Sequence, residues 1–339
     1  MSHTRKKTKI VATLGPAINS KEMLLKMVAA GVNVFRINFS HADYEDVKLR
    51  IKHIREINEE HGYNASILAD LQGPKLRVGV MKDDVVVNPG DEIIFATGER
   101  FEGTKERVYM TYDRFPLDTN PGERILLDDG KIHLKVTSVK KCEIRTKVLQ
   151  GGYLKSNKGV NLPQTNIKTS ALSTIDKKFA SLAVQEGVDW IALSFVQKPN
   201  DIKELKKICS NKASIMAKIE KPSALDYLDQ ITTLADGIMI ARGDLGVELP
   251  IESVPGWQKK IIRVARVKGK PVVVSTQMLE SMTSSLTPTR AEVSDVANAV
   301  FEGADAIMLS AESASGDYPV ETVKMMNKIA INIEKDSNY

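Results

Sequence analysis

Eight short apolar runs, rich in β-branched residues, recur along the chain and restrict its fold more than any other feature. They lie at Lys9–Leu14, Val34–Phe39, Ser66–Asp70, Trp190–Phe195, Ile215–Ile219, Gly237–Ala241, Pro271–Thr276 and Ala306–Leu309. Parallel strands need continuous apolar runs because both of their faces are buried. Apolar residues between the runs are instead spaced as on one helix face, as in the sets Leu24/Leu25/Val28, Ile175/Phe179/Leu182 and Val293/Val296/Ala297/Val300. The pattern therefore predicts alternating strands and helices.

The junctions between helices and strands also repeat. Gly31, Gly187 and Gly303 each stand just after a predicted helix and just before a predicted strand, where glycine supplies a left-handed helix cap. Eight such right-handed β/α units close into a (β/α)8 TIM barrel. An open doubly wound sheet is the rival fold, but it would normally carry a glycine-rich dinucleotide loop after an early strand, and the sequence has none.

The middle of the chain has a different pattern. Between Gly73 and Ile167 helical spacing disappears and turn sequences such as Asn88–Asp91 and Asp128–Gly130 crowd in. The runs between them predict hairpin strands at Asp84–Val87, Glu92–Ala96, Ile125–Leu127, Ile132–Val136 and Glu143–Val148. We therefore expect barrel segments at residues 1–72 and 168–339 and an inserted β-rich domain at 73–167. Its position after the third strand suits a lid over a barrel active site.

Composition narrows the class of protein. Hydrophobic residues make up 42% of the chain, charged residues 27%, and the formal charge is +5, which fits an enzyme of anionic metabolites but also a protein without special partners. Cys142 and Cys209 match no metal or redox spacing. No stretch could span a membrane and no signal peptide is evident, so we expect a cytoplasmic location and no membrane partner.

Polar residues gather where the predicted strands end, which is the catalytic face of a barrel. These residues are Arg36, Asn38 and Ser40 on strand two, Asp70 on strand three, Lys218 and Glu220 on strand five, Asp244 after strand six, Thr276 after strand seven and Ser310 after strand eight. A single Asp or Ser after a strand reads best as a helix cap, and Lys218 could simply pair with Glu220. Buried charges are costly, however, and a structural rim has no reason to collect two carboxylates, a lysine and an arginine.

The residue types indicate the chemistry. Glu220 and Asp244 are hard oxygen ligands, suited to Mg²⁺ or Mn²⁺ completed by water and substrate oxygens. Lys218 and Arg36 supply positive charge for a phosphoryl group, and the backbone N–H groups of Gly243 and Asp244 can bind a carboxylate. These parts describe a phosphorylated carboxylic acid as the substrate.

Six motifs in order resemble the pyruvate kinase family, and the resemblance extends from Thr8 to the end of the chain. They are Thr8–Pro16, Phe35–His41, Ala217–Glu220, Ala241–Gly246, Ser275–Met282 and Pro288–Glu292. The resemblance implies a glycolytic phosphotransferase that moves phosphate from phosphoenolpyruvate to ADP, giving ATP and pyruvate.

The resemblance also implies residue roles. Lys218 would stabilise the moving phosphoryl group, Glu220 and Asp244 would hold the metal, and Arg36 would bind substrate phosphate. Thr276 with the Gly243–Asp244 backbone would hold the carboxylate, and Ser310 would lie near the proton route to the enol carbon. The residues placed around the nucleotide phosphates are Asn38, His41, Arg77 and Lys158, although Lys158 could equally be an ordinary turn lysine.

One motif departs from the family. Residues 70–75 read Asp-Leu-Gln-Gly-Pro-Lys, where most members have Asp-Thr-Lys-Gly-Pro-Glu and use a potassium ion whose ligands match Asn38, Ser40, Asp70 and the Leu71 position. Leu71 lacks the hydroxyl, and Lys75 would repel the ion by about 4 kcal/mol at 4 Å and an effective dielectric of 20. A minority of the family carries lysine here and needs no potassium, so we expect Lys75 to replace the ion. In the alternative, Lys75 points to solvent and the ion still binds at Asp70.

The family normally continues into a C-terminal domain with an effector site, whereas this sequence ends at Tyr339. We therefore expect no activation by sugar phosphates, and either a monomer or a homo-oligomer formed through the barrel. Two other functions stay open at this point. One is a metal-dependent aldolase or lyase acting on pyruvate enolates, and the other is a catalytically silent binding protein, for instance for RNA; we expect no nucleic-acid partner.

Overall fold

The computed structural model describes residues 6–39, 43–165 and 167–336. Eight parallel strands form a closed barrel in the order β1-β16-β15-β14-β13-β12-β3-β2, which confirms the predicted fold class. Their bounds are β1 Lys9–Thr13, β2 Val34–Asn38, β3 Ser66–Asp70, β12 Trp190–Leu193, β13 Ser214–Ile219, β14 Gly237–Ala241, β15 Val272–Ser275 and β16 Ala306–Leu309. The eight predicted runs all became strands, with ends shifted by at most two residues.

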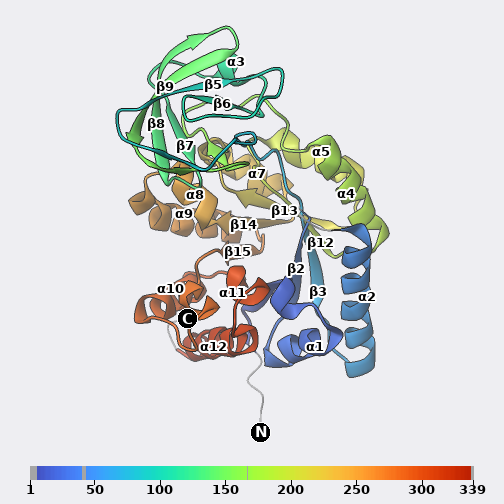
Figure 1. Cartoon of the computed structure of the whole chain (residues 1–339). Helices are drawn as coiled ribbons and strands as arrows, with labels where there is room; N and C mark the ends of the chain where they lie inside the picture. Colours follow the sequence, from blue (N-terminus) through green and yellow to red (C-terminus); the bar gives the residue numbers. More distant parts are fainter. Residues whose placement is uncertain (1–5, 40–42, 166, 337–339) are drawn as a thin grey trace.

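Helices surround this barrel (Figure 1). They are α1 Lys21–Ala30, α2 Tyr44–His61, α4 Thr174–Gln185, α5 Pro199–Cys209, α6 Pro222–Asp226, α7 Leu228–Leu234, α8 Arg242–Glu248, α9 Val254–Val267, α10 Arg290–Phe301, α11 Ala311–Ala314 and α12 Pro319–Ile333, with 3-10 turns η1 Pro16–Ile18, η2 Ile251–Ser253 and η3 Glu280–Thr283. Gly31, Gly187 and Gly303 have φ of 127°, 68° and 96°, as expected of glycines that end helices.

The predicted apolar stripe on α4 was partly wrong. Ile175 is 58% exposed, whereas Ala180 and Ala183 are buried against the barrel. Ile175 lies in the first turn of the helix, close to the capping residue Ser173. The buried face of α4 instead carries Ala180 and Ala183.

The segment between β3 and β12 forms a separate β-rich unit at one end of the barrel (Figure 1), which we call the inserted domain. Its elements are β4 Val85–Val87, β5 Glu92–Ala96, β6 Arg107–Tyr109, α3 Phe115–Asp118, β7 Arg124–Leu127, β8 Ile132–Lys140, β9 Glu143–Gln150, β10 Gly152–Leu154 and β11 Val160–Asn161. The exact boundaries at residues 73 and 167 stay a prediction.

Strand pairing inside the inserted domain differs in part from simple hairpins. β7, β8 and β9 form the expected antiparallel run, with the left-handed turn Asp128–Gly130 between the first two. However, β4 pairs with β10, and β5 pairs in parallel with β6 and antiparallel with β9. The partners β6 and β10 were not predicted, because neither has a continuous β-branched run like the three valines of β4.

Alternate residues of each barrel strand face the helices or the barrel axis. On β14, for example, Ile238 and Ile240 belong to the core shared with the helices, whereas Met239 belongs to a smaller cluster of buried residues with Val11, Leu68, Ala192, Met216, Val273, Ala306 and Met308. Such layers fill the interior of a TIM barrel. Residues two positions beyond this inner layer therefore point inward at the rim that carries the inserted domain.

Candidate functional site

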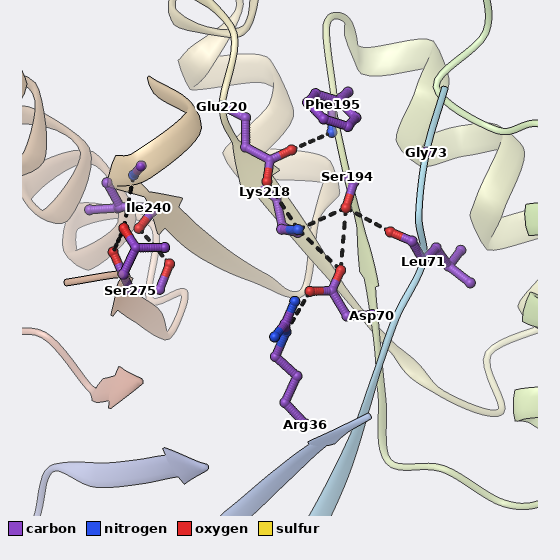
Figure 2. Close-up of polar contacts among 12 residues, drawn as sticks. Arg36, Asp70, Leu71, Gly73, Ser194, Phe195, Lys218, Glu220, Ile240 and Ser275 are labelled. Carbon is purple, nitrogen blue, oxygen red and sulfur yellow. Dashed lines mark hydrogen bonds and ion pairs between the residues drawn. The ribbon is translucent and has the colours of Figure 1, made fainter. Parts of the chain in front are cut away.

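Period-two alternation brings the principal charged residues together at this rim. Arg36, Asp70 and Lys218 stand on β2, β3 and β13 in register with the inner layer, and Glu220 follows two residues after Lys218. The Lys218 ammonium lies 3.2 Å from Asp70 Oδ1, 3.0 Å from Glu220 Oε1 and 2.7 Å from Ser194 Oγ (Figure 2). On its other side Asp70 accepts a 2.6 Å hydrogen bond from Arg36 Nε.

Charge balance keeps Lys218 and Asp70 ionised despite their burial. Burial disfavours the charge on Lys218, but Asp70 and Glu220 outweigh it and raise the pKa of the lysine. Burial likewise opposes the charge on Asp70, but Lys218 and Arg36 hold its pKa below the usual value. The site thus keeps a permanent ammonium and a permanent guanidinium, which is what binding of a phosphoryl group requires.

For Glu220, unlike Asp70, the surroundings raise the pKa. Burial raises its pKa more than Lys218 lowers it, and nearby Asp244 raises it further. Its second oxygen accepts a 2.6 Å hydrogen bond from the backbone N–H of Phe195, which has a left-handed φ of 54°. Two neighbouring carboxylates that repel one another suit a divalent cation, because the cation removes the repulsion.

The donor set fits a small hard cation rather than a protein cage. In the described residues, no group of three or more His, Cys, Asp or Glu side chains is placed to hold a metal. Glu220 and Asp244 would leave most coordination positions to water and substrate oxygens, which is the usual arrangement for Mg²⁺.

The predicted carboxylate site forms a second group. Gly243 lies in α8, and its N–H donates to Thr276 Oγ1 at 2.8 Å. Thr276 and Gln277 have φ of 72° and 52°, a strained conformation for a β-branched residue in particular. Arg242 holds this loop by donating to the Thr276 carbonyl at 2.6 Å, while Asp295 pairs with the same guanidinium at 2.7 Å.

Ser310 follows β16 at the same rim and is half-buried. Its N–H donates to Glu312 at 2.7 Å, and Glu312 also accepts from the N–H of Leu279. The carboxylate of Glu312 therefore fixes the loop that carries Ser310.

The two predicted nucleotide ligands of the inserted domain make their polar contacts within that domain. Arg77 donates to the Asn157 carbonyl at 2.9 Å, and Lys158 pairs with Asp128 at 2.8 Å. Arg77 forms a β-bridge with Gly159, so both cations stand on neighbouring backbone within the inserted domain. Asn38 ends β2, while Ser40 and His41 lie outside the described residues.

Lys75 is exposed and lies near the start of the inserted domain. A Cβ on Gly159 would stand 3.2 Å from Lys75 Cε, so the side chain runs along that backbone. Lys75 also lines a cavity together with Phe195 and Asp244. Its replacement of potassium stays a prediction, and the charge of Asp70 is already balanced by Arg36 and Lys218.

An open cleft of about 900 Å³ separates the inserted domain from the barrel rim. Gly243 and Asp244 line it from α8, and Lys75, Asp129 and His133 line it from the inserted domain. A cleft between two domains is a usual position for a substrate site, and this one is lined by Asp244, the predicted metal ligand whose charge acts on Glu220.

Sequence reasoning missed Ser194, which touches Lys218 directly. Ser194 comes two residues after Ala192 of the inner layer, so period two places it at the rim with the charged residues. The signal was a serine at the end of an otherwise apolar strand.

Comparison with known proteins agrees with this arrangement. A family model described as "Pyruvate kinase, barrel domain" matches residues 5–323. A pyruvate kinase of Methylorubrum extorquens is 51% identical over 334 residues, covering 98% of this chain and 70% of that protein. Pyruvate kinases of Agrobacterium vitis and Corynebacterium glutamicum are each 46% identical, over 99% and 98% of this chain and 71% and 70% of their own lengths. The chain belongs to the pyruvate kinase family.

Proposed function

We propose that the chain transfers the phosphoryl group of phosphoenolpyruvate to ADP, giving ATP and pyruvate. Membership of the family makes it a phosphotransferase, and the observation that carries the finer assignment is the buried cluster of Arg36, Asp70, Lys218 and Glu220. Two fixed cations next to a pair of carboxylates suit a phosphorylated acid that arrives with a divalent metal.

For the substrate, Arg36 and Lys218 would bind the phosphoryl oxygens, and Lys218 would gain importance as charge moves onto them. The carboxylate would bind at Thr276 and the N–H groups of Gly243 and Asp244. Because Gly243 already donates to Thr276 Oγ1, carboxylate binding would exchange that contact for one to the substrate. Ser310 would contribute to proton delivery after phosphoryl transfer.

Glu220 and Asp244 would hold Mg²⁺ or Mn²⁺, which supplies Lewis-acid polarisation of the phosphoryl oxygens when bound. The carboxylate of Glu220 would then turn from Lys218 towards the ion. This exchange would release one N–H of Lys218 for the substrate.

The nucleotide phosphates would contact Asn38, His41, Arg77 and Lys158. Arg77 and Lys158 each contact one partner within the inserted domain, Asn157 and Asp128, and keep further N–H donors for the phosphates. Closure of the inserted domain over the cleft would bring them to the phosphates and exclude water.

For the monovalent site we propose that Lys75 makes potassium unnecessary. The family site would involve Asn38, Ser40, Asp70 and the carbonyl of Leu71. That carbonyl already accepts a 2.6 Å hydrogen bond from the Ser194 hydroxyl.

The test is ATP formation from phosphoenolpyruvate and ADP, measured with and without a divalent metal. Metal-dependent ATP formation supports the proposal, whereas cleavage or aldol addition of pyruvate without ATP would favour a lyase or aldolase. Nucleic-acid affinity that falls steeply with salt, without any turnover, would instead favour a silent binding protein. Family membership disfavours both outcomes.

A further inference from the structure

Ser194 makes three contacts from a fully enclosed position directly after β12. The side chain is 3% exposed, and its Oγ lies 2.7 Å from Lys218 Nζ, 2.6 Å from the Leu71 carbonyl and 3.3 Å from Asp70 Oδ1 (Figure 2). A hydroxyl has one proton to give. The short contact with the carbonyl takes that proton, because two oxygen acceptors approach so closely only with a proton between them. The lone pairs of Ser194 are thereby left to receive Lys218.

Lys218 has three N–H donors and three acceptors around it, namely Asp70, Ser194 and Glu220. Every donor is engaged, so the lysine can bind a phosphoryl oxygen only if one of these contacts opens. Glu220 is the contact that metal binding would withdraw. Asp70 is shared with Arg36 at 2.6 Å, so its charge is divided between two cations.

We propose that Ser194 is a positioning residue that orients the Lys218 ammonium towards the phosphoryl group during its transfer. The proposal rests on the role assigned to Lys218 in the proposed function. A neutral acceptor suits this task, because a third carboxylate would cancel the positive charge that the phosphoryl group needs. The Ser194 hydroxyl fixes the ammonium without adding charge.

The second contact of Ser194 connects the lysine to the start of the inserted domain. Leu71 lies two residues before Gly73, which has a left-handed φ of 69° and packs on Ser194 so closely that a Cβ would stand 3.1 Å from Ser194 Cβ. The position of Lys218 is therefore linked through one hydroxyl to the backbone that leads into the inserted domain.

The variant Ser194→Ala removes the acceptor and leaves both carboxylates. We expect kcat to fall between about tenfold and a hundredfold, the range for losing a hydrogen bond to a charged group or misplacing a catalytic group by about 1 Å. The KM for phosphoenolpyruvate should stay within about twofold, since the contact matters mainly in the transition state. Should this variant fail to fold, Ser194→Cys keeps the volume but accepts hydrogen bonds weakly, and the same loss is expected.

Ser275→Ala is the matched control. Ser275 is also a fully buried inward-facing serine at the end of a barrel strand, and its Oγ donates to the Ile240 carbonyl at 2.9 Å without touching Lys218 (Figure 2). We expect a similar change in thermal stability and an unchanged kcat. An equal loss of kcat in both variants would assign the effect to a looser barrel and overturn the proposal.

A double-mutant cycle with Lys218→Met separates the proposal from the function it rests on. If Ser194 acts through Lys218, adding Ser194→Ala to Lys218→Met should cause no further loss. Near-normal turnover of Lys218→Met would refute the role of the lysine itself. A large loss in Lys218→Met with none in Ser194→Ala would refute only the role of Ser194.

Discussion

Replacing Glu220 by glutamine tests the metal site most directly, because the contacts of this side chain predict two separate effects. Its two oxygens accept from two donors, the Lys218 ammonium at 3.0 Å and the Phe195 N–H at 2.6 Å. Glutamine has one acceptor oxygen and one NH₂ group, so in either orientation a donor faces a donor. A buried donor left unpaired costs about 1–3 kcal/mol, which is the expected loss of unfolding free energy.

The metal affinity should change more than the stability. Glu220→Gln removes one of two anionic ligands, and even the loss of an outer partner of a metal ligand costs about 10–100-fold in affinity. At a Mg²⁺ concentration 100 times the Kd the parent should gain about 2.7 kcal/mol of stability, whereas a variant with a 100-fold higher Kd should gain about 0.4 kcal/mol. The raised pKa of Glu220 adds a pH dependence, since protonation competes with the metal. Half-saturation should therefore rise as the pH falls, beginning at a higher pH than for an ordinary glutamate.

The assays are the Mg²⁺ dependence of ATP formation and thermal unfolding with and without Mg²⁺. Glu312→Gln is the matched control, because Glu312 is equally buried and its two oxygens also accept from two N–H groups, those of Ser310 and Leu279. It should lose similar stability without a change in metal half-saturation. Half-saturation of Glu220→Gln within twofold of the parent would show that the glutamate is not a metal ligand.

Three further predictions follow from the same contacts. Lys218→Met should keep phosphoenolpyruvate and metal binding but raise the activation free energy of phosphoryl transfer by about 2.7–4 kcal/mol, measured as a fall in kcat. Near-normal turnover would contradict the mechanism. The parent should be fully active without potassium and sodium, and Leu71→Thr with Lys75→Glu should create a potassium requirement; a more than few-fold activation of the parent by potassium at constant ionic strength would disprove this. Burial raises the pKa of Cys209 to about 11 while Cys142 is exposed, so a thiol reagent at pH 8 should titrate one thiol in the folded chain and two after unfolding, and rapid reaction of both would contradict the packing.

The inserted domain shows why some of the fold could not be read from the sequence. The turn at Asp128–Gly130 was recognisable because its residues favour left-handed backbone. The pairing of β4 with β10 joins segments more than sixty residues apart, and no local pattern specifies such a partner. In the described part of the chain, no helix is long and apolar enough to cross a membrane.

The sequence by itself determined the barrel and the identity of its rim residues. Buried parallel strands require continuous apolar runs, and period two then decides which side chains point inward, so Arg36, Lys218 and Glu220 were predictable as neighbours. Only the tertiary structure decided which atoms meet. Lys218 has three acceptors from three different strands or loops, and Gly243 bonds to Thr276 from the next strand, because closure of the barrel sets these distances. Ser194 shows the limit: alternation could place it at the rim, but its contact with Lys218 depends on the neighbouring strand β13 and became visible only in the folded chain.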